Sequence, residues 1–250
     1  CGHTSHVRLA SGAHAPMPRA SQRALARALA LRSASRASAS EVTMPGGSIA
    51  TIFMASSRAM SAPLFIPEDL APGDRRACEA GSHLRVQVVR DPGDPLFDRL
   101  YQRLWHEFGH RNEMERRDVI VGRLARDPRD LAHGHALLYE LLAILDGDEV
   151  VGLRDHTAIV PPSDATAAST RVLVHLSHVI VEPPHRGTGL SGWLRALPLQ
   201  TARACAAAVG RRCDAITLVG EMEHPDDAPD VQARLRSYDR AGFRKLDPRQ

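Results

Sequence analysis

The stretch that decides the fold is Val181-Glu-Pro-Pro-His-Arg-Gly-Thr-Gly-Leu-Ser-Gly-Trp193. The β-prone run Val172–Val181 ends there, and a helix is expected to begin at about Thr188. Glycines at such a junction let the backbone approach a ligand closely, and free N–H groups at a helix N-terminus bind phosphate oxygens. Arg186 adds a charge-assisted donor. The stretch predicts a strand–loop–helix unit that captures a pyrophosphate, the alternative being a glycine-rich turn that only connects the two elements.

The sequence on both sides of this stretch mixes strand and helix patterns. Strands are expected at Leu84–Arg90, in two runs of Ala136–Val160 joined at Asp146-Gly147-Asp148, at Val172–Val181 and at Ala215–Glu221. Helices are expected at Pro95–His110, Glu113–Asp127, Gly187–Gly210 and Val231–Ala241, the third being kinked at Pro198. The fold class is therefore α/β, in the sense of an α+β mixed sheet with helices on its faces.

Two motifs in this order resemble a known family. Arg186-Gly-Thr-Gly-Leu-Ser191 is similar to the Q/R-x-x-G-x-G/A coenzyme A loop of the GCN5-related N-acetyltransferases (GNAT), with Ser191 where Gly or Ala is usual. Tyr238-Asp-Arg-Ala-Gly-Phe243 resembles the closing Y-x-x-x-G-F segment of that family. The resemblance covers about Leu84–Pro248 and implies the order β-α-α-β-β-β-α-β-α-β around a central mixed, splayed sheet. It also implies that the last strand is missing from this chain.

The resemblance implies acetyl-CoA as co-substrate, held between the strand before the loop and the next strand. It assigns the pantetheine arm to the backbone of Val179, Ile180 and Val181. It assigns the pyrophosphate to Arg186, Gly187, Thr188, Gly189, Ser191 and Gly192. A primary amine would attack the thioester of acetyl-CoA, or of another short acyl-CoA, directly and without a covalent acyl-enzyme.

This reaction needs a base for the ammonium proton and an acid for the departing thiolate. Tyr238 matches the family position of the acid, although a tyrosine there could equally be a core residue. The base is expected among His175, His178, Glu221 and Glu223, with period-two alternation placing the two histidines on opposite faces of their strand. Segments Glu221–Asp227 and Arg154–His156 could also line a pocket for a cationic acceptor, the latter alternatively forming a buried ion pair.

Two other functions compete with this interpretation. His106-Glu107-Phe-Gly-His110 fits H-E-x-x-H on an expected helix, so the two histidines could bind Zn²⁺ with Glu107 as the base of a metallohydrolase. No third ligand of the metzincin type follows, and Gly109 lowers helix propensity, so no metal is expected. A non-catalytic acyl-CoA-binding domain is the other alternative, because no obvious base accompanies the loop. If the segment at His110 instead ends the first helix of an acetyltransferase, then His110, Asn112 and Glu113 could contact the acceptor.

Composition excludes several classes. The 250 residues are 43% hydrophobic and 24% charged, with a net charge of +3, and no run of about 18 apolar residues could span a membrane. The basic excess lies in the first 83 residues, so nucleic acid is not an expected partner. Residues 1–83 are expected to be a low-complexity Ala/Arg/Ser-rich extension and linker, disordered or serving as a targeting segment. The acetyltransferase domain is expected at residues 84–250.

The four cysteines contain no C-x-x-C pair and no regular disulfide framework. They are interpreted as free thiols that require no oxidising compartment, so a cytoplasmic protein is expected. A homodimer is one assembly that the sequence allows.

Overall fold

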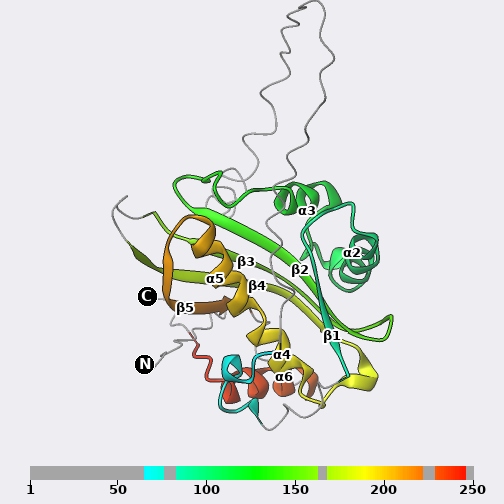
Figure 1. The fold of residues 1–250 in the computed structure, drawn as a ribbon. Coiled ribbons are helices and arrows are strands. Elements are labelled where there is room, and N and C mark those ends of the chain that lie inside the picture. The colour runs from blue at the N-terminus through cyan, green and yellow to red at the C-terminus, as the bar shows by residue number, and fades with distance from the viewer. Residues whose placement is uncertain (1–64, 76–82, 163–167, 222–228, 246–250) are drawn as a thin grey trace, which may run out of the picture. The chain divides into compact units, whose positions relative to one another are not determined.

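The strands of the computed structural model form one mixed, open sheet in the order β1-β2-β3-β4-β5 (Figure 1). The structure describes residues 65–75, 83–162, 168–221 and 229–245. The strands are β1 Arg85–Val89, β2 Ala136–Asp146, β3 Glu149–Val160, β4 Ser169–Val181 and β5 Arg212–Gly220. Neighbours from β1 to β4 are antiparallel, and β4 and β5 are parallel. This sheet confirms the predicted fold class.

Helices cover both faces of the sheet. They are α2 Pro95–Phe108, α3 Arg117–Leu124, α4 Leu190–Ala196, α5 Pro198–Ala208 and α6 Pro229–Arg240, with short 3-10 turns η1 Pro67–Asp69, η3 Gly109–Arg111 and η4 Pro183–His185. Apolar side chains of α2 and α3 pack on one face, hereafter the α2–α3 face. Those of α4 and α5, and the α6 residue Tyr238, pack on the other, hereafter the α4–α6 face. None of the helices within the described residues is long and apolar enough to cross a bilayer.

The order of elements follows from local chemistry. The Asp94 carboxylate accepts a hydrogen bond from Leu96 N at 2.8 Å and Pro95 takes the first helical position, so α2 begins there. Gly147 turns the β2–β3 hairpin with a φ of 55°. Pro198 separates α4 from α5, as predicted, because proline cannot donate the helical hydrogen bond. The observed order is β-α-α-β-β-β-α-α-β-α, with two helices where one kinked helix was predicted, and the predicted last strand falls on residues 246–250, outside the described residues.

Several predicted boundaries differ from the structure, and three of the differences bear on the site. The second helix, expected over Glu113–Asp127, forms only over Arg117–Leu124, because Asn112 adopts a left-handed conformation with φ 56° and the chain stays irregular to residue 116. The helix after β4 begins at Leu190 rather than at about Thr188, after the left-handed Gly189. The folded part also extends upstream of the boundary predicted at residue 84.

The upstream segment 65–75, inside the predicted linker, packs on α4 and α5. Leu70 is buried, and the Asp69 and Asp74 carboxylates pair with Arg203 and Arg195 at 2.6 and 2.8 Å. Apolar burial and two ion pairs therefore hold this segment on the sheet's helical layer. Residues 1–64, including the separate unit His14–Ser61, and residues 76–82 lie outside the described residues.

Candidate active site

Strand β4 separates from β5 partway along its length. The two strands pair from Ser169 and Arg212 to Leu176 and Gly220, and β4 then continues to Val181 with only β3 beside it in the described part of the chain. We call this open edge of β4, over Ser177–Val181, the splay. It is the feature that the family resemblance implied.

Backbone groups along the splay are directed by the hydrogen bonds to β3. The N–H of Glu182 donates to Val151 O at 3.0 Å, and the N–H of His178 donates to the Asp155 carboxylate at 2.8 Å, both toward β3. Since backbone groups alternate sides along a strand, Val179 and Val181 direct theirs toward the splay. Val179 therefore offers an extended ligand with amide groups a donor and an acceptor that no other described residue uses, while Val181 O already accepts from Arg186 Nε at 3.1 Å.

The loop after β4 carries the predicted pyrophosphate residues. Gly187 and Gly189 have φ values of 80° and 97°, which favour glycine, and Thr188 Oγ1 donates to His185 O at 2.6 Å. Arg186, Gly187 and Thr188 are exposed, and Arg186 uses only its Nε within the described residues. The tip of the loop thus presents a cation and backbone groups to solvent.

The rest of the predicted set is less accessible. Ser191 is half-buried, whereas Gly192 is buried, and a Cβ added there would lie 2.9 Å from the Asp74 Cβ. The Gly192 N–H already donates to Gly189 O at 2.9 Å. Gly192 therefore serves close packing of the upstream segment against α4. Its part in pyrophosphate binding stays a prediction.

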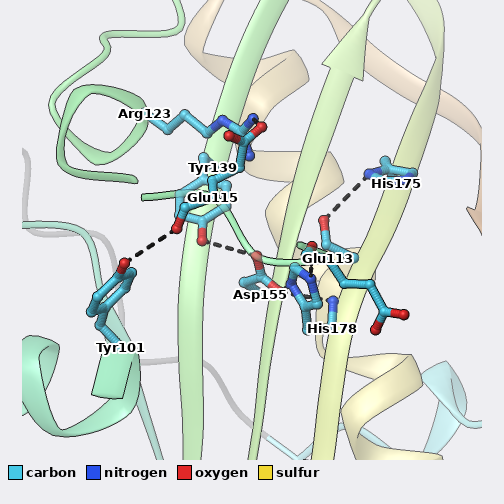
Figure 2. A network of polar contacts seen from close by, with 9 residues as sticks. Tyr101, Glu113, Glu115, Arg123, Tyr139, Asp155, His175 and His178 are labelled. Atoms are coloured by element: carbon cyan, nitrogen blue, oxygen red, sulfur yellow. Dashed lines mark hydrogen bonds and ion pairs between the residues drawn. The ribbon is translucent and has the colours of Figure 1, made fainter. Parts of the chain in front are cut away.

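A hydrogen-bonded chain of side chains lies on the α2–α3 face next to the splay. Figure 2 shows Tyr139, Asp155 and His178, from three adjacent strands, pointing toward one another. Asp155 Oδ2 accepts from the Tyr139 hydroxyl at 3.0 Å, and Asp155 Oδ1 contacts His178 Nδ1 at 2.9 Å. His178 Nε2 lies 2.8 Å from the backbone oxygen of Glu113, so the loop between α2 and α3 is attached to β4. Neither Tyr139 nor the pairing of Asp155 with His178 was predicted from the sequence.

A β-bulge explains how His178 reaches this position. The register between β3 and β4 shifts around Asp155, so Ser177 and His178 together face one residue of β3. His175 and His178 consequently lie on the same α2–α3 face, and the predicted placement on opposite faces is wrong. Regular alternation does not hold across a bulge.

Charge is concentrated in the Asp155–His178 pair. Burial favours the neutral carboxyl, but the hydrogen bonds and charge of His178 outweigh it and lower the pKa of Asp155. Burial also opposes the charged imidazole, yet Asp155 and the Glu113 backbone raise the pKa of His178 above its ordinary value. Both ring nitrogens face acceptors, so each carries a proton in this arrangement. His178 is therefore a cation paired to a buried anion.

Tyr238 lies on the opposite, α4–α6 face. Gly242, with φ 85°, returns the chain after α6, and the Phe243 N–H donates to Tyr238 O at 3.0 Å. The two rings then meet edge to face with centroids 4.8 Å apart, which explains the Y-x-x-x-G-F spacing. The Tyr238 hydroxyl accepts a hydrogen bond from Arg154 Nη2 at 3.3 Å. Tyr238 is thus both a core residue and a holder of a buried polar contact.

The remaining candidates are dispersed. Glu221 is exposed directly after β5, near the level where β4 and β5 separate, and Glu223 lies outside the described residues. The side chains of Arg154, Asp155 and His156 do not pair with one another. Asp155 faces α2 and α3, where it pairs with His178, while the two flanking side chains face α5 and α6.

The two histidines of the predicted zinc site do not have the helical arrangement that the H-E-x-x-H motif requires. Helix α2 ends at Phe108, and His110 falls in the 3-10 turn η3. His106 and His110 therefore do not share one helix face as predicted. Among the described residues, no group of three or more His, Cys, Asp or Glu side chains could hold a metal ion.

His156 makes the stability of the fold depend on pH. It is fully buried, and burial, with the Arg154 charge, lowers its pKa from 6.5 to about 3. The unfolded chain therefore binds a proton below pH 6.5 that the folded chain does not, and stability falls as the pH drops toward 3. When the pH falls from 7.5 to 4.5, the His156→Gln variant should lose about 3 kcal/mol less unfolding free energy than the wild-type chain loses. Urea unfolding at both pH values measures this.

The exposed His106→Gln is the matched control for that measurement, because its ring is already solvated in the fold. A pH dependence in His156→Gln equal to that of the wild-type chain would contradict the burial of a neutral imidazole.

Comparison with known proteins gives a likeness of fold. No protein-family model matches the chain, and no curated protein matches it in sequence. Similar solved structures include an aminoglycoside acetyltransferase from an uncultured soil metagenomic sample, with 18% identity over 66% of this chain and 93% of that one, TM-score 0.41. Another aminoglycoside N-acetyltransferase, crystallised with CoA, has 16% identity over 67% and 91%, TM-score 0.38. A ribosomal-protein-alanine N-acetyltransferase from Brucella melitensis biovar Abortus has 15% identity over 62% and 90%, TM-score 0.37.

These identities and TM-scores are too low to transfer a function from those proteins. The motifs at Arg186 and Tyr238, the order of the elements and the splay between β4 and β5 are features of this chain itself. In those features it resembles the GCN5-related N-acetyltransferases.

Proposed function

We propose that the protein transfers an acetyl group, or another short acyl group, from coenzyme A to a primary amine. The observation that carries this proposal is the splay: an open strand edge leads directly into a glycine-rich loop with an exposed arginine. An extended thioester with amide groups and a pyrophosphate at one end fits such a surface.

Each part of the site has a task in this reaction. The Val179–Val181 backbone bonds the pantetheine amides, and Arg186, Gly187, Thr188, Gly189, Ser191 and Gly192 form the pyrophosphate side. Tyr238 donates a proton to sulfur as the C–S bond breaks and its electron pair stays on sulfur. Glu221 or His178 first takes a proton from the substrate ammonium, and the neutral amine that results attacks the acyl carbon. Glu221 is the better recipient at neutral pH, because His178 already holds a proton on each nitrogen.

Arg186→Ala should weaken acetyl-CoA binding by roughly 1.5–3 kcal/mol, the contribution of a charge-assisted hydrogen bond. Calorimetric titration of the full chain with acetyl-CoA measures the affinity. Arg129→Ala is the control, since Arg129 is an exposed arginine paired only with Asp127 in the described residues. Equal affinity of the Arg186 variant and the wild-type chain would contradict the proposed loop.

Turnover with a panel of primary amines separates catalysis from binding. Release of free CoA thiol that depends on the amine supports the enzyme. Saturable acetyl-CoA binding without turnover on any amine would favour the non-catalytic alternative.

A further inference from the structure

Arg154 is a buried cation that forms no ion pair with any of the residues that the structure describes. Its side chain is on β3 and only 1% of the residue is exposed. Nη2 contacts the neutral Tyr238 hydroxyl, while Nε and Nη1 have no hydrogen-bond partner in the described part of the chain. An unpaired buried charge lowers the free energy of unfolding by several kcal/mol, so Arg154 is expected to serve a function other than stabilising the fold.

The contrast with Arg195 shows that this is not the usual arrangement here. Arg195 is 5% exposed, and its Nη2 and Nε bond the Asp74 carboxylate at 2.8 and 3.2 Å. Its guanidinium also lies over the Tyr238 ring, 5.3 Å from the centroid. Two buried arginines therefore contact the same tyrosine, and within residues 65–75, 83–162, 168–221 and 229–245 only Arg195 is paired with a carboxylate.

Two acidic residues on β2 and β3, Glu140 and Asp155, are engaged with other partners. Glu140 accepts from Arg90 Nε and from Thr201 Oγ1, both at 2.6 Å. Asp155, the next residue of β3, points to the opposite face and holds His178. Among the described residues, no carboxylate pairs with Arg154, so its positive charge acts directly on the Tyr238 hydroxyl.

The hydrogen bond from Arg154 restricts the direction in which the Tyr238 hydroxyl proton can point. A guanidinium has only donors, so the Tyr238 oxygen must be the acceptor and its own proton must point elsewhere. The described residues give that proton no acceptor. When the proton leaves, the phenolate charge forms 3.3 Å from the guanidinium nitrogen, where burial makes the attraction stronger than in water.

We propose that Arg154 is a positioning residue for Tyr238, an inference that rests on the proposed function. Arg154 directs the hydroxyl proton toward the splay and stabilises the phenolate formed in the transfer. In that step the amine nitrogen bonds the acyl carbon, the C–S bond breaks and its electron pair goes to sulfur. Tyr238 gives its proton to sulfur, nitrogen releases its extra proton to solvent as the amide forms, and the phenolate regains a proton from solvent.

A double-mutant cycle in the full chain tests this proposal. Arg154→Met should lower kcat roughly 10–100-fold, the range of one charge-assisted hydrogen bond, with little change in the Kd of acetyl-CoA. Arg154→Lys should restore part of kcat because it keeps a charged donor. In the background of Tyr238→Phe, Arg154→Met should cost almost nothing further, since its partner is already absent.

Urea unfolding separates positioning from a structural role. Removal of an unpaired buried charge should leave Arg154→Met at least as stable as the wild-type chain, whereas Arg195→Met should be less stable because Asp74 loses its partner. Losses in kcat that multiply in the double variant, or marked destabilisation by Arg154→Met, would overturn the proposal alone. Failure of the wild-type chain to bind acetyl-CoA would overturn the proposed function and this inference with it.

Discussion

Tyr238→Phe is expected to lower kcat by roughly 10²–10⁴-fold, the usual contribution of a positioned general acid. The leaving thiolate would then have to take its proton from water. Affinity for acetyl-CoA should stay close to the wild-type value, because phenylalanine keeps the edge-to-face contact with Phe243. Steady-state turnover with a saturating amine gives kcat, and calorimetry gives the affinity.

Tyr101→Phe is the matched control for that measurement. It removes a hydroxyl that donates to Glu115 O at 3.3 Å on the other face of the sheet, so kcat should stay near the wild-type value. Turnover by Tyr238→Phe equal to that of the wild-type chain would remove Tyr238 from the mechanism and leave it as a core residue.

Asp155→Asn is expected to lower the free energy of unfolding by about 3–5 kcal/mol at pH 6, the cost of breaking a buried ion pair. Asparagine keeps the shape but leaves the His178 cation without its counter-charge, and it cannot accept all the hydrogen bonds that Asp155 accepts. Urea unfolding of the full chain measures the loss.

The sign of the pH dependence follows from the two pKa shifts. Because the pKa of His178 is raised in the folded state, the stability that the charged ring contributes is fully present below pH 6.5. This stability is lost as the pH rises through the folded-state pKa. The lowered pKa of Asp155 means that its contribution is present above 3.8 and is lost in acid. The effect of Asp155→Asn should therefore be largest between about pH 4 and 6.5 and smaller at pH 9.

Asp98→Asn provides the control, because Asp98 pairs with Arg117 in solvent, with more than half of each side chain exposed. An exposed pair contributes at most about 1 kcal/mol. A loss in Asp155→Asn no larger than in Asp98→Asn would show that the buried pair is not formed.

Much of the fold could be predicted because its signals are local. Hydrophobic alternation marked the strands, the Asp-Gly step marked the hairpin, and Pro198 marked the break between α4 and α5. The splay was implied by family resemblance alone, since nothing in the residues of β5 states where its pairing with β4 ends.

The partners within the site could not be predicted, because they depend on register. A single bulge places Asp155 opposite His178 and both histidines on one face. The contact between Arg154 and Tyr238 joins residues 84 positions apart, and it depends on where α6 crosses the sheet. Three consecutive ionisable residues in an apolar strand were the only sequence signal for either contact.

The upstream segment changes what counts as the smallest piece of this chain able to fold. A chain trimmed to begin at residue 84 would keep the five strands and five α-helices of the part that the structure describes. It would nevertheless remove the carboxylates that neutralise Arg195 and Arg203 and the Leu70 side chain that covers α4. Trimming by secondary structure alone would thus leave Arg195, beside Tyr238, without its Asp74 partner. A loss of activity in such a fragment would then reflect the removal of the upstream segment.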